Sequence, residues 1–250
     1  MDQEFRIVTA GDRALQIEFR NEISIETSAL VTHVRCELEK ETLPGVLAVQ
    51  QAYCSLLLYY RPEEICCEKL KERLMRLIGG MDFRYEKPDR VFVTEIPVLY
   101  GGEWGPDVDE VAEYEKISAA EVISRHSAEP HYLYYIGFTP GLPYLGSQGE
   151  TFHVPRRATP RVHLPRGSVT VWRNQTTVFP VDQPGGWHVI GRTPLRLFDL
   201  RRDPQILLTA GQWVQFRPID RAEYDAIDRE AEEGTFTAKT YWMEQAAAGS

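Results

Sequence analysis

Regular patterns of hydrophobic and polar residues fill the first third of the chain. Four segments alternate like strands: residues 5–8, 14–19, 46–50 and 55–60. Two further segments have apolar residues one helical turn apart, at Leu30, Val34 and Leu38 and at Leu70, Leu74, Leu77 and Ile78. Two strands followed by a helix, twice over, predict a small two-layer α/β domain at residues 1–86.

Proline changes the pattern in the second half. Five of the 16 prolines precede residue 130, and the other 11 lie between Pro130 and Pro218. Because proline breaks helix interiors, short strands joined by turns are expected there, in a barrel or a sandwich. We place this β domain at residues 91–225, after a linker at 87–90 and before a polar C-terminal tail at 226–250. The predicted fold class is α+β.

Two short helices are expected near the start of the β domain. Asp107 stands three residues before Glu110, and Ser118 three residues before Glu121, which are capping-box patterns. They predict helices at about 108–116 and 119–126.

Composition narrows the class of protein. Hydrophobic residues make up 43% of the chain and charged residues 26%, and no apolar run reaches the roughly 18 residues of a membrane helix. The first residues are acidic, where a secretory signal would be basic. We expect a cytoplasmic protein with no membrane partner.

Charge is distributed unevenly along the chain. The net charge of −9 argues against nucleic acid as a partner. Residues 153–202, however, contain nine arginines and only two acidic residues, Asp182 and Asp199, which gives a net charge of +7. The other 200 residues carry a net charge of −16. The acidic protein therefore has a basic segment within its β region.

Common catalytic motifs are missing from the sequence. It contains no GxGxxG, P-loop, GxSxG or HExxH pattern, and its four cysteines form no CxxC pair. His126 and His131 do not have metal-ligand spacing on one helix. We expect no metal site and no autonomous nucleotide site of a common type.

Three segments rich in glycine, proline and aromatic residues are the candidates for a site: 137–146, 155–161 and 184–195. Glycine lets a backbone approach a ligand closely, and proline fixes the shape of a loop. Arginine binds carboxylate or phosphate through two parallel hydrogen bonds, so arginines on rigid loops suit a small anion. The alternatives are tight turns of a β domain and ordinary ion pairs at the rim of a barrel.

These segments carry a family resemblance. Residues 96–107 (IPVLYGGEWGPD), GFTPGLPYLG, PRRATPR and PGGWHVIGRTPLRLFD resemble the allophanate hydrolase subunit 1 family, which includes the 5-oxoprolinase B subunits (PxpB) and the kinase inhibitor KipI. Weaker similarity at residues 11–15 and 53–57 extends the resemblance to nearly the whole chain.

The resemblance implies a cyclophilin-like β-barrel after the α/β domain, without implying prolyl isomerase activity. It also implies a 5-oxoprolinase B subunit that works with the C subunit, of the allophanate hydrolase subunit 2 family, and with the A subunit. Together these three proteins use ATP to open 5-oxoproline to L-glutamate, and the isolated chain is expected to be inactive.

The sequence departs from the family pattern in one stretch. Where relatives read close to AGSVGIAGGQTGIYP, this chain has residues 166–180, RGSVTVWRNQTTVFP. Trp172, Arg173 and Thr177 replace small residues, and Leu142 stands where phenylalanine is usual. These larger side chains are expected to crowd or reshape a pocket lined by backbone.

The site hypothesis assigns roles by residue type. Arg156, Arg161 and Arg192 are candidates for anion contacts, Gln175 and Thr176 for orienting polar atoms, and Tyr144 and Trp187 for apolar walls. Pro140, Gly141, Gly185 and Gly186 would supply the backbone of the pocket. Glu103 and Gln175 are the candidate catalytic side chains.

Two other functions remain open from the sequence. A KipI-like protein would bind a sensor histidine kinase and inhibit its autophosphorylation. A carboxyltransferase component of a urea or allophanate pathway would need a partner that carries biotin, because this chain has no biotinyl-lysine motif of the Met-Lys-Met type.

Overall fold

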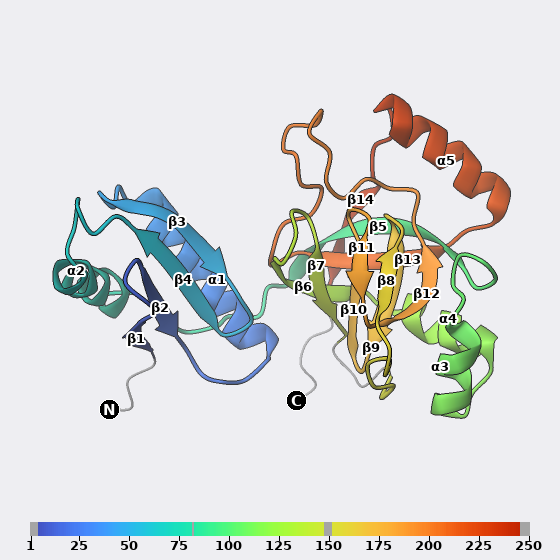
Figure 1. Cartoon of the computed structure of the whole chain (residues 1–250), viewed down its shortest axis with the longest axis horizontal. Coiled ribbons are helices and arrows are strands. Elements are labelled where there is room, and N and C mark those ends of the chain that lie inside the picture. The colour runs from blue at the N-terminus through green and yellow to red at the C-terminus, as the bar shows by residue number, and fades with distance from the viewer. Residues whose placement is uncertain (1–4, 82, 148–151, 246–250) are drawn as a thin grey trace. The chain divides into compact units, whose positions relative to one another are not determined.

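A computed structural model describes residues 5–81, 83–147 and 152–245 of the chain (Figure 1). The chain divides into two compact units, residues 1–87 and 88–250. The division falls at the start of the 87–90 segment that we expect to be a linker.

The N-terminal unit is a four-stranded antiparallel sheet with two helices (Figure 1). Its elements are β1 (Arg6–Thr9), β2 (Ala14–Glu18), α1 (Ile25–Lys40), β3 (Val46–Gln51), β4 (Ser55–Tyr60) and α2 (Cys67–Gly79). The strand order is β1-β2-β4-β3. Alternate residues of β2 and β4, such as Leu15 and Leu58, pack with Val34 of α1 and Leu74 of α2 in one buried cluster. The two-layer α/β arrangement and all six predicted elements are confirmed.

The second unit is built around a closed β-barrel. Its strands are β5 (Arg90–Tyr100), β6 (His131–Ile136), β7 (Pro143–Gly146), β8 (Arg161–Leu164), β9 (Ser168–Trp172), β10 (Gln175–Val178), β11 (Gln183–Gly185), β12 (His188–Arg192), β13 (Trp213–Pro218) and β14 (Thr240–Glu244). Its helices are α3 (Val108–Glu115), α4 (Ala119–Ala128) and α5 (Arg221–Glu233).

Strand pairing closes the barrel. The order β12-β9-β10-β7-β6-β13-β5 is completed by pairing of β12 with β5, at Gly191 with Tyr100 and Arg192 with Leu99. β13 and β5 are parallel, whereas the other pairs in the ring are antiparallel. β8 and β11 form a separate two-stranded sheet. The α+β class with a barrel in the second unit is confirmed.

Only one of the two predicted capping boxes forms. Ser118 accepts a hydrogen bond from the backbone N–H of Glu121 at 3.1 Å and caps α4. Asp107 occupies the N-cap position of α3, but its side chain makes no capping bond. The helix expected at about 108–116 forms, but the capping role expected for Asp107 was wrong, because its side chain is engaged by distant arginines instead, as described below.

The C-terminal region also differs from the expected polar tail at 226–250. α5 ends at Glu233, with Gly234 as its C-cap, and β14 pairs with β5 along five residue pairs, from Thr240 with Thr94 to Glu244 with Arg90. The second unit therefore includes ordered structure up to Glu244, while residues 246–250 lie outside the described part. Among the described residues, no helix is long and apolar enough to cross a membrane.

Candidate functional site

A pocket of about 370 Å³ brings together residues from all three predicted segments. We call it the Arg156 pocket; its lining residues are Phe138, Leu142, Tyr144, Arg156, Arg157, Pro160, Thr177, Phe179, Pro184, Gly185, Gly186 and Trp187. Five of these, Tyr144, Arg156, Gly185, Gly186 and Trp187, belong to the site predicted from sequence.

The apolar part of the pocket rests on a small buried cluster. Leu142 and Phe179 pack with Leu164 and Val189, and Tyr144 packs against the cluster. The ring of Tyr144 also stacks on Tyr135, with centroids 4.3 Å apart. These contacts fix the aromatic wall without using a ligand.

Arg156 lies against two tryptophan rings. The guanidinium carbon of Arg156 is 4.3 Å from the ring centroid of Trp172 and 6.0 Å from that of Trp187. The two indoles are themselves 5.5 Å apart. Stacking of this kind stabilises a cation by about 0.5–2 kcal/mol. Trp172, one of the departures from the family pattern, therefore holds a charged side chain at the pocket.

The loop that carries Arg156 is fastened by a buried carboxylate. Asp107, whose side chain is 3% exposed, accepts hydrogen bonds from Arg161 at 2.6 Å and from Arg157 at 3.0 Å. It also accepts one from the backbone N–H of Val189 at 2.7 Å. The hydrogen bond with Asp107 raises the pKa of Arg161. One side chain thus ties the arginine loop to β12.

Glu110 extends this network. It forms an ion pair with Arg157, and one of its carboxylate oxygens lies 3.2 Å from Nε2 of the buried His188. The backbone N–H of Arg157 donates to the carbonyl of Gly186 at 2.9 Å. The loop is therefore held through both side chains and backbone.

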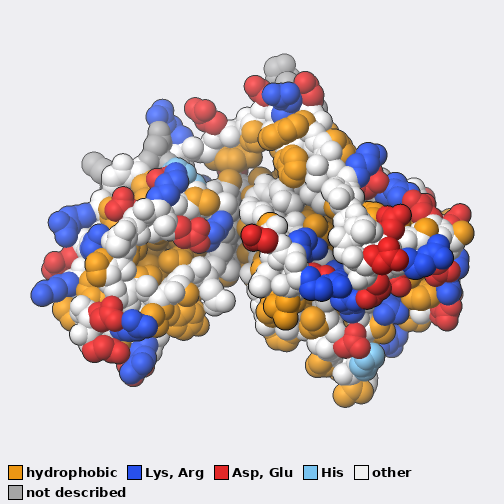
Figure 2. Space-filling model, turned by 90° about the horizontal axis from the view of Figure 1, so that it is seen from above, with side chains coloured by type: hydrophobic (Ala, Val, Ile, Leu, Met, Phe, Trp, Pro, Cys, Tyr) orange, Lys and Arg blue, Asp and Glu red, His pale blue; other side chains and the backbone are white. Residues whose placement is uncertain are grey.

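Most arginines of the basic segment have acidic or carbonyl partners within the unit. Arg166 and Arg196 pair with Glu232 of α5, Arg201 pairs with Asp199, and Arg202 donates to backbone carbonyls. On the face shown in Figure 2, Lys and Arg side chains lie beside Asp and Glu side chains over the barrel unit. Carboxylates outside the segment, such as Glu232, thus offset part of its charge of +7.

Arg156 and Arg173 differ from these four arginines in the kind of partner that their side chains have. Within the described part of the chain, no carboxylate oxygen lies within 4.0 Å of either guanidinium, and both guanidinium groups lie over aromatic rings. Arg173 stacks on Trp172 at 5.6 Å but does not line the Arg156 pocket. Arg156 is therefore the pocket arginine whose hydrogen-bond donors remain for an anion.

Several predicted site residues lie elsewhere. The side chain of Glu103 is 76% exposed and is 3.5 Å from Arg221. Arg192 donates from Nε to the carbonyl of Arg166 at 2.9 Å and lies over Trp104. Arg161 donates hydrogen bonds from both of its terminal nitrogens to the carboxylate of Asp107. None of these three lines the Arg156 pocket.

Pro140 and Gly141 form a turn beside the pocket rather than its lining. Gly141 has φ = +81°, and a Cβ atom there would lie 2.9 Å from the Cβ of Phe198. The neighbouring Phe138, which was not assigned a role from sequence, lines the pocket and is 79% exposed. The turn therefore presents Phe138 at the pocket, and Gly141 allows close packing behind it.

Thr176 belongs to a buried polar cluster. Its hydroxyl donates to the carbonyl of Thr170 at 2.9 Å, so Nε2 of His126, 3.0 Å away, is the donor to that hydroxyl. Nδ1 of His126 then accepts from the hydroxyl of Tyr100 at 2.7 Å. His131 donates from Nε2 to the carbonyl of His126 at 2.9 Å. Burial lowers the pKa of His126 well below its usual value and that of His131 to about 4.

Gln175 pairs through its backbone with Gly146 and Trp172 and is half-buried. Like Thr176, it does not line the Arg156 pocket. Sequence reasoning missed Thr177 and Phe179 as lining residues, although Thr177 is one of the departures from the family pattern. Alternation along β10 puts Thr176 and Thr177 on opposite faces, which would have separated their roles.

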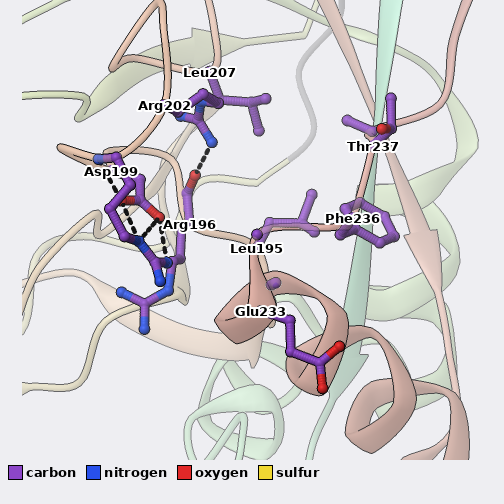
Figure 3. A pocket seen from close by; sticks show the side chains of 12 residues that line it. Leu195, Arg196, Asp199, Arg202, Leu207, Glu233, Phe236 and Thr237 are labelled. Carbon is purple, nitrogen blue, oxygen red and sulfur yellow. Dashed lines mark hydrogen bonds and ion pairs between the residues drawn. The ribbon is translucent and has the colours of Figure 1, made fainter.

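A larger pocket, of about 530 Å³, lies between the 195–207 segment and the end of α5 (Figure 3). Leu195, Leu207 and Phe236 line it together with charged residues. Its arginines are engaged: Arg201 with Asp199, Arg196 with Glu232, and Arg202 with carbonyls. Of the three candidate segments only the last residue, Leu195, lines this pocket, and none of the residues given a site role does, so we do not place the candidate site there.

No group of three or more metal-ligating His, Cys, Asp or Glu side chains occurs in the described part of the chain. Its four cysteines are free thiols.

Comparisons with known proteins identify relatives along almost the whole chain. The family model for the carboxyltransferase domain, subdomain C and D, matches residues 5–208. The chain is 35% identical over 241 residues to the 5-oxoprolinase B subunit of Bacillus subtilis, covering 92% of this chain and 100% of that protein. It is 36% identical to the 5-oxoprolinase B subunit of Escherichia coli O157:H7, over 86% of this chain and 97% of that protein.

A solved structure supports the fold. The urea amidolyase of Kluyveromyces lactis superposes with a TM-score of 0.80 at 17% identity, over 96% of this chain and 16% of that much longer chain. The family model and the 5-oxoprolinase B subunits confirm the resemblance expected from the sequence motifs. The chain belongs to the carboxyltransferase domain subdomain C and D family, in which its relatives include the 5-oxoprolinase B subunits.

Proposed function

We propose that this chain is the B subunit of an ATP-dependent 5-oxoprolinase and acts in complex with the A and C subunits of that enzyme. The observation that carries the proposal is its 35% identity to the B. subtilis relative over that protein's full length. The E. coli relative extends the same similarity over 97% of its own length.

The reaction adds water across a lactam. The ring C–N bond breaks, the carbonyl carbon gains a hydroxyl and becomes a carboxylate, and the nitrogen gains a proton and becomes the amine of L-glutamate. The sequence has no P-loop, so we assign ATP use to the complex and not to a site on this chain. The Arg156 pocket is our candidate for the part of the substrate site that this chain supplies. Roles for Glu103 and Gln175 remain predictions.

Reconstitution tests the proposal. The three proteins are purified separately and mixed, and L-glutamate formation from 5-oxoproline is measured with and without ATP. We expect ATP-dependent glutamate only when this chain is present together with the A and C subunits. No glutamate from the full mixture, with the B subunit of a known 5-oxoprolinase restoring activity in its place, would refute the proposal.

A carboxyltransferase role is the second candidate. The chain is 22% identical to urea amidolyase of Lachancea kluyveri over 91% of this chain, which is 14% of that protein. This candidate predicts a biotin-bearing partner and bicarbonate-dependent carboxylation of urea or a related amide. Pull-down of the chain from its own cells, probed for biotin, separates the two candidates, since the 5-oxoprolinase proposal requires no biotinylated chain.

A further inference from the structure

The contacts of Arg156 leave its strongest recognition surface open. A guanidinium uses its face to stack on an aromatic ring, whereas its N–H donors lie in its plane. The guanidinium carbon of Arg156 lies over the Trp172 ring, 4.3 Å from its centroid, so its neighbour there is an aromatic ring and not an acidic side chain. Its in-plane donors have no carboxylate within 4.0 Å among the described residues. Two such donors can form paired hydrogen bonds with the two oxygens of a carboxylate.

The rest of the pocket limits the ligand. A volume of about 370 Å³ is at the small end of small-molecule sites, which run from roughly 300 to 1,000 Å³. Leu142, Tyr144, Phe179 and Trp187 make the lining largely apolar. The other arginine of the pocket, Arg157, is already paired with Asp107 and Glu110. One available cation among apolar walls suits a single negative charge on a compact body, not a nucleotide with several phosphate charges.

We infer that the Arg156 pocket binds a compact monocarboxylate, with Arg156 forming paired hydrogen bonds to the carboxylate and the apolar walls enclosing the body of the ligand. The identification of that ligand as 5-oxoproline rests on the proposed function. The ring of 5-oxoproline is small and carries one carboxylate, which fits both limits.

Binding can be measured without catalysis. Isothermal titration calorimetry and tryptophan fluorescence are applied to the chain alone and to its complex with the A and C subunits, using 5-oxoproline and 2-pyrrolidinone, the same ring without a carboxylate. The variants are Arg156→Gln and, as a matched control, Arg173→Gln, which removes the other arginine stacked on Trp172. Thermal unfolding of each variant verifies that it is folded.

We expect Arg156→Gln to weaken 5-oxoproline binding about 10- to 100-fold, the loss typical of a charge-assisted hydrogen-bond pair. Arg173→Gln should leave the Kd within twofold. 2-Pyrrolidinone should bind wild type and Arg156→Gln equally. The inference is overturned if Arg156→Gln binds 5-oxoproline as wild type does, or if neither the chain nor the complex binds it in an Arg156-dependent way. Inorganic phosphate binding more tightly than 5-oxoproline would overturn the ligand class.

The outcome is separable from that of the proposed function. If the complex makes no glutamate but 5-oxoproline binding still depends on Arg156, the inference stands and the proposed function fails. If the complex makes glutamate and Arg156→Gln has the wild-type KM, the proposed function stands and the inference fails.

Discussion

Asp107 accepts hydrogen bonds from both terminal nitrogens of Arg161, at 2.6 Å each, although it occupies the N-cap position of α3. Its carboxylate also holds Arg157 and the backbone of Val189. The first helix of the barrel unit therefore begins at a residue that fastens the arginine loop. Changes at Asp107 should act on the whole loop and not on one helix end.

Replacing Asp107 should cost more stability than replacing a true cap. Asp107→Ala removes the charge partner of two partly buried arginines and an acceptor for the Val189 N–H, so we expect a loss of about 3 kcal/mol. Ser118→Ala, which removes the cap of α4, should cost about 1 kcal/mol. Urea unfolding at neutral pH measures both, and equal losses in the two variants would contradict the role given to Asp107.

Arg192 should not take part in ligand binding. Its Nε is engaged by the carbonyl of Arg166, and its guanidinium lies over Trp104, 5.2 Å from the ring centroid. Arg192→Gln is therefore expected to keep the 5-oxoproline Kd within twofold of wild type in the calorimetric assay. A tenfold higher Kd in this variant would show that Arg192 does contribute to ligand binding.

The buried histidines should make stability depend on pH. Burial lowers the pKa of His131 to about 4, against about 6.5 in an unfolded chain. Between these values the unfolded chain binds a proton that the folded chain does not, so stability is full above about pH 6.5 and falls as the pH drops toward 4. From pH 7.5 to pH 5, His131 alone should account for a loss of about 2 kcal/mol.

Urea unfolding at pH 7.5, 6 and 5 checks this dependence. His131→Gln keeps a donor for the His126 carbonyl but does not titrate, so its stability should fall less over this range. His163→Gln is the control, because the side chain of His163 is 63% exposed. An identical pH dependence in wild type and His131→Gln would show that the buried ring is not the cause.

Gly105 should tolerate no side chain. A Cβ atom there would lie 2.0 Å from the carbonyl oxygen of Ile190 in β12, whose backbone has little room to move within the barrel. We expect Gly105→Ala to lower the free energy of unfolding by about 3 kcal/mol. Gly79→Ala is the matched control, since nothing lies within 4 Å of its added Cβ and alanine favours the helix. Equal stability of the two variants would refute the close contact.

Local periodicity was sufficient to predict the elements of the N-terminal unit. Apolar residues recur at every second position around Leu15 and Leu58 in the strands, and about one turn apart around Val34 and Leu74 in the helices. It was not sufficient for β14, whose residues alternate only between exposed and half-buried. Such a strand has no continuous apolar face and resembles a polar tail in sequence.

The sequence predicted the loops of the candidate site but not which of their arginines is available. Clusters of glycine, proline and aromatic residues marked the loops that meet at the Arg156 pocket. Which arginine is available depends on partners far away in sequence, such as Asp107 for Arg161, and the carbonyl of Arg166 with the ring of Trp104 for Arg192. Those pairings cannot be predicted from local sequence. Three arginines were therefore candidates for anion binding, and in the folded chain only Arg156 of the three lines the pocket.

The pairing of β5 sets an order for folding of the barrel. β5 is the first strand of its unit to be synthesised, yet its partners β12, β13 and β14 are among the last. β12 is complete at Arg192, but β13 ends only at Pro218 and β14 at Glu244, so the pairing of β5 stays incomplete until residue 244 has been made. Until β13 is added, the core side chains Ile96 and Val98 are not enclosed by a closed barrel. The N-terminal unit, with all its strands within 60 residues, can mature during translation, whereas the barrel must wait for nearly the full chain and is the part exposed to aggregation or chaperones.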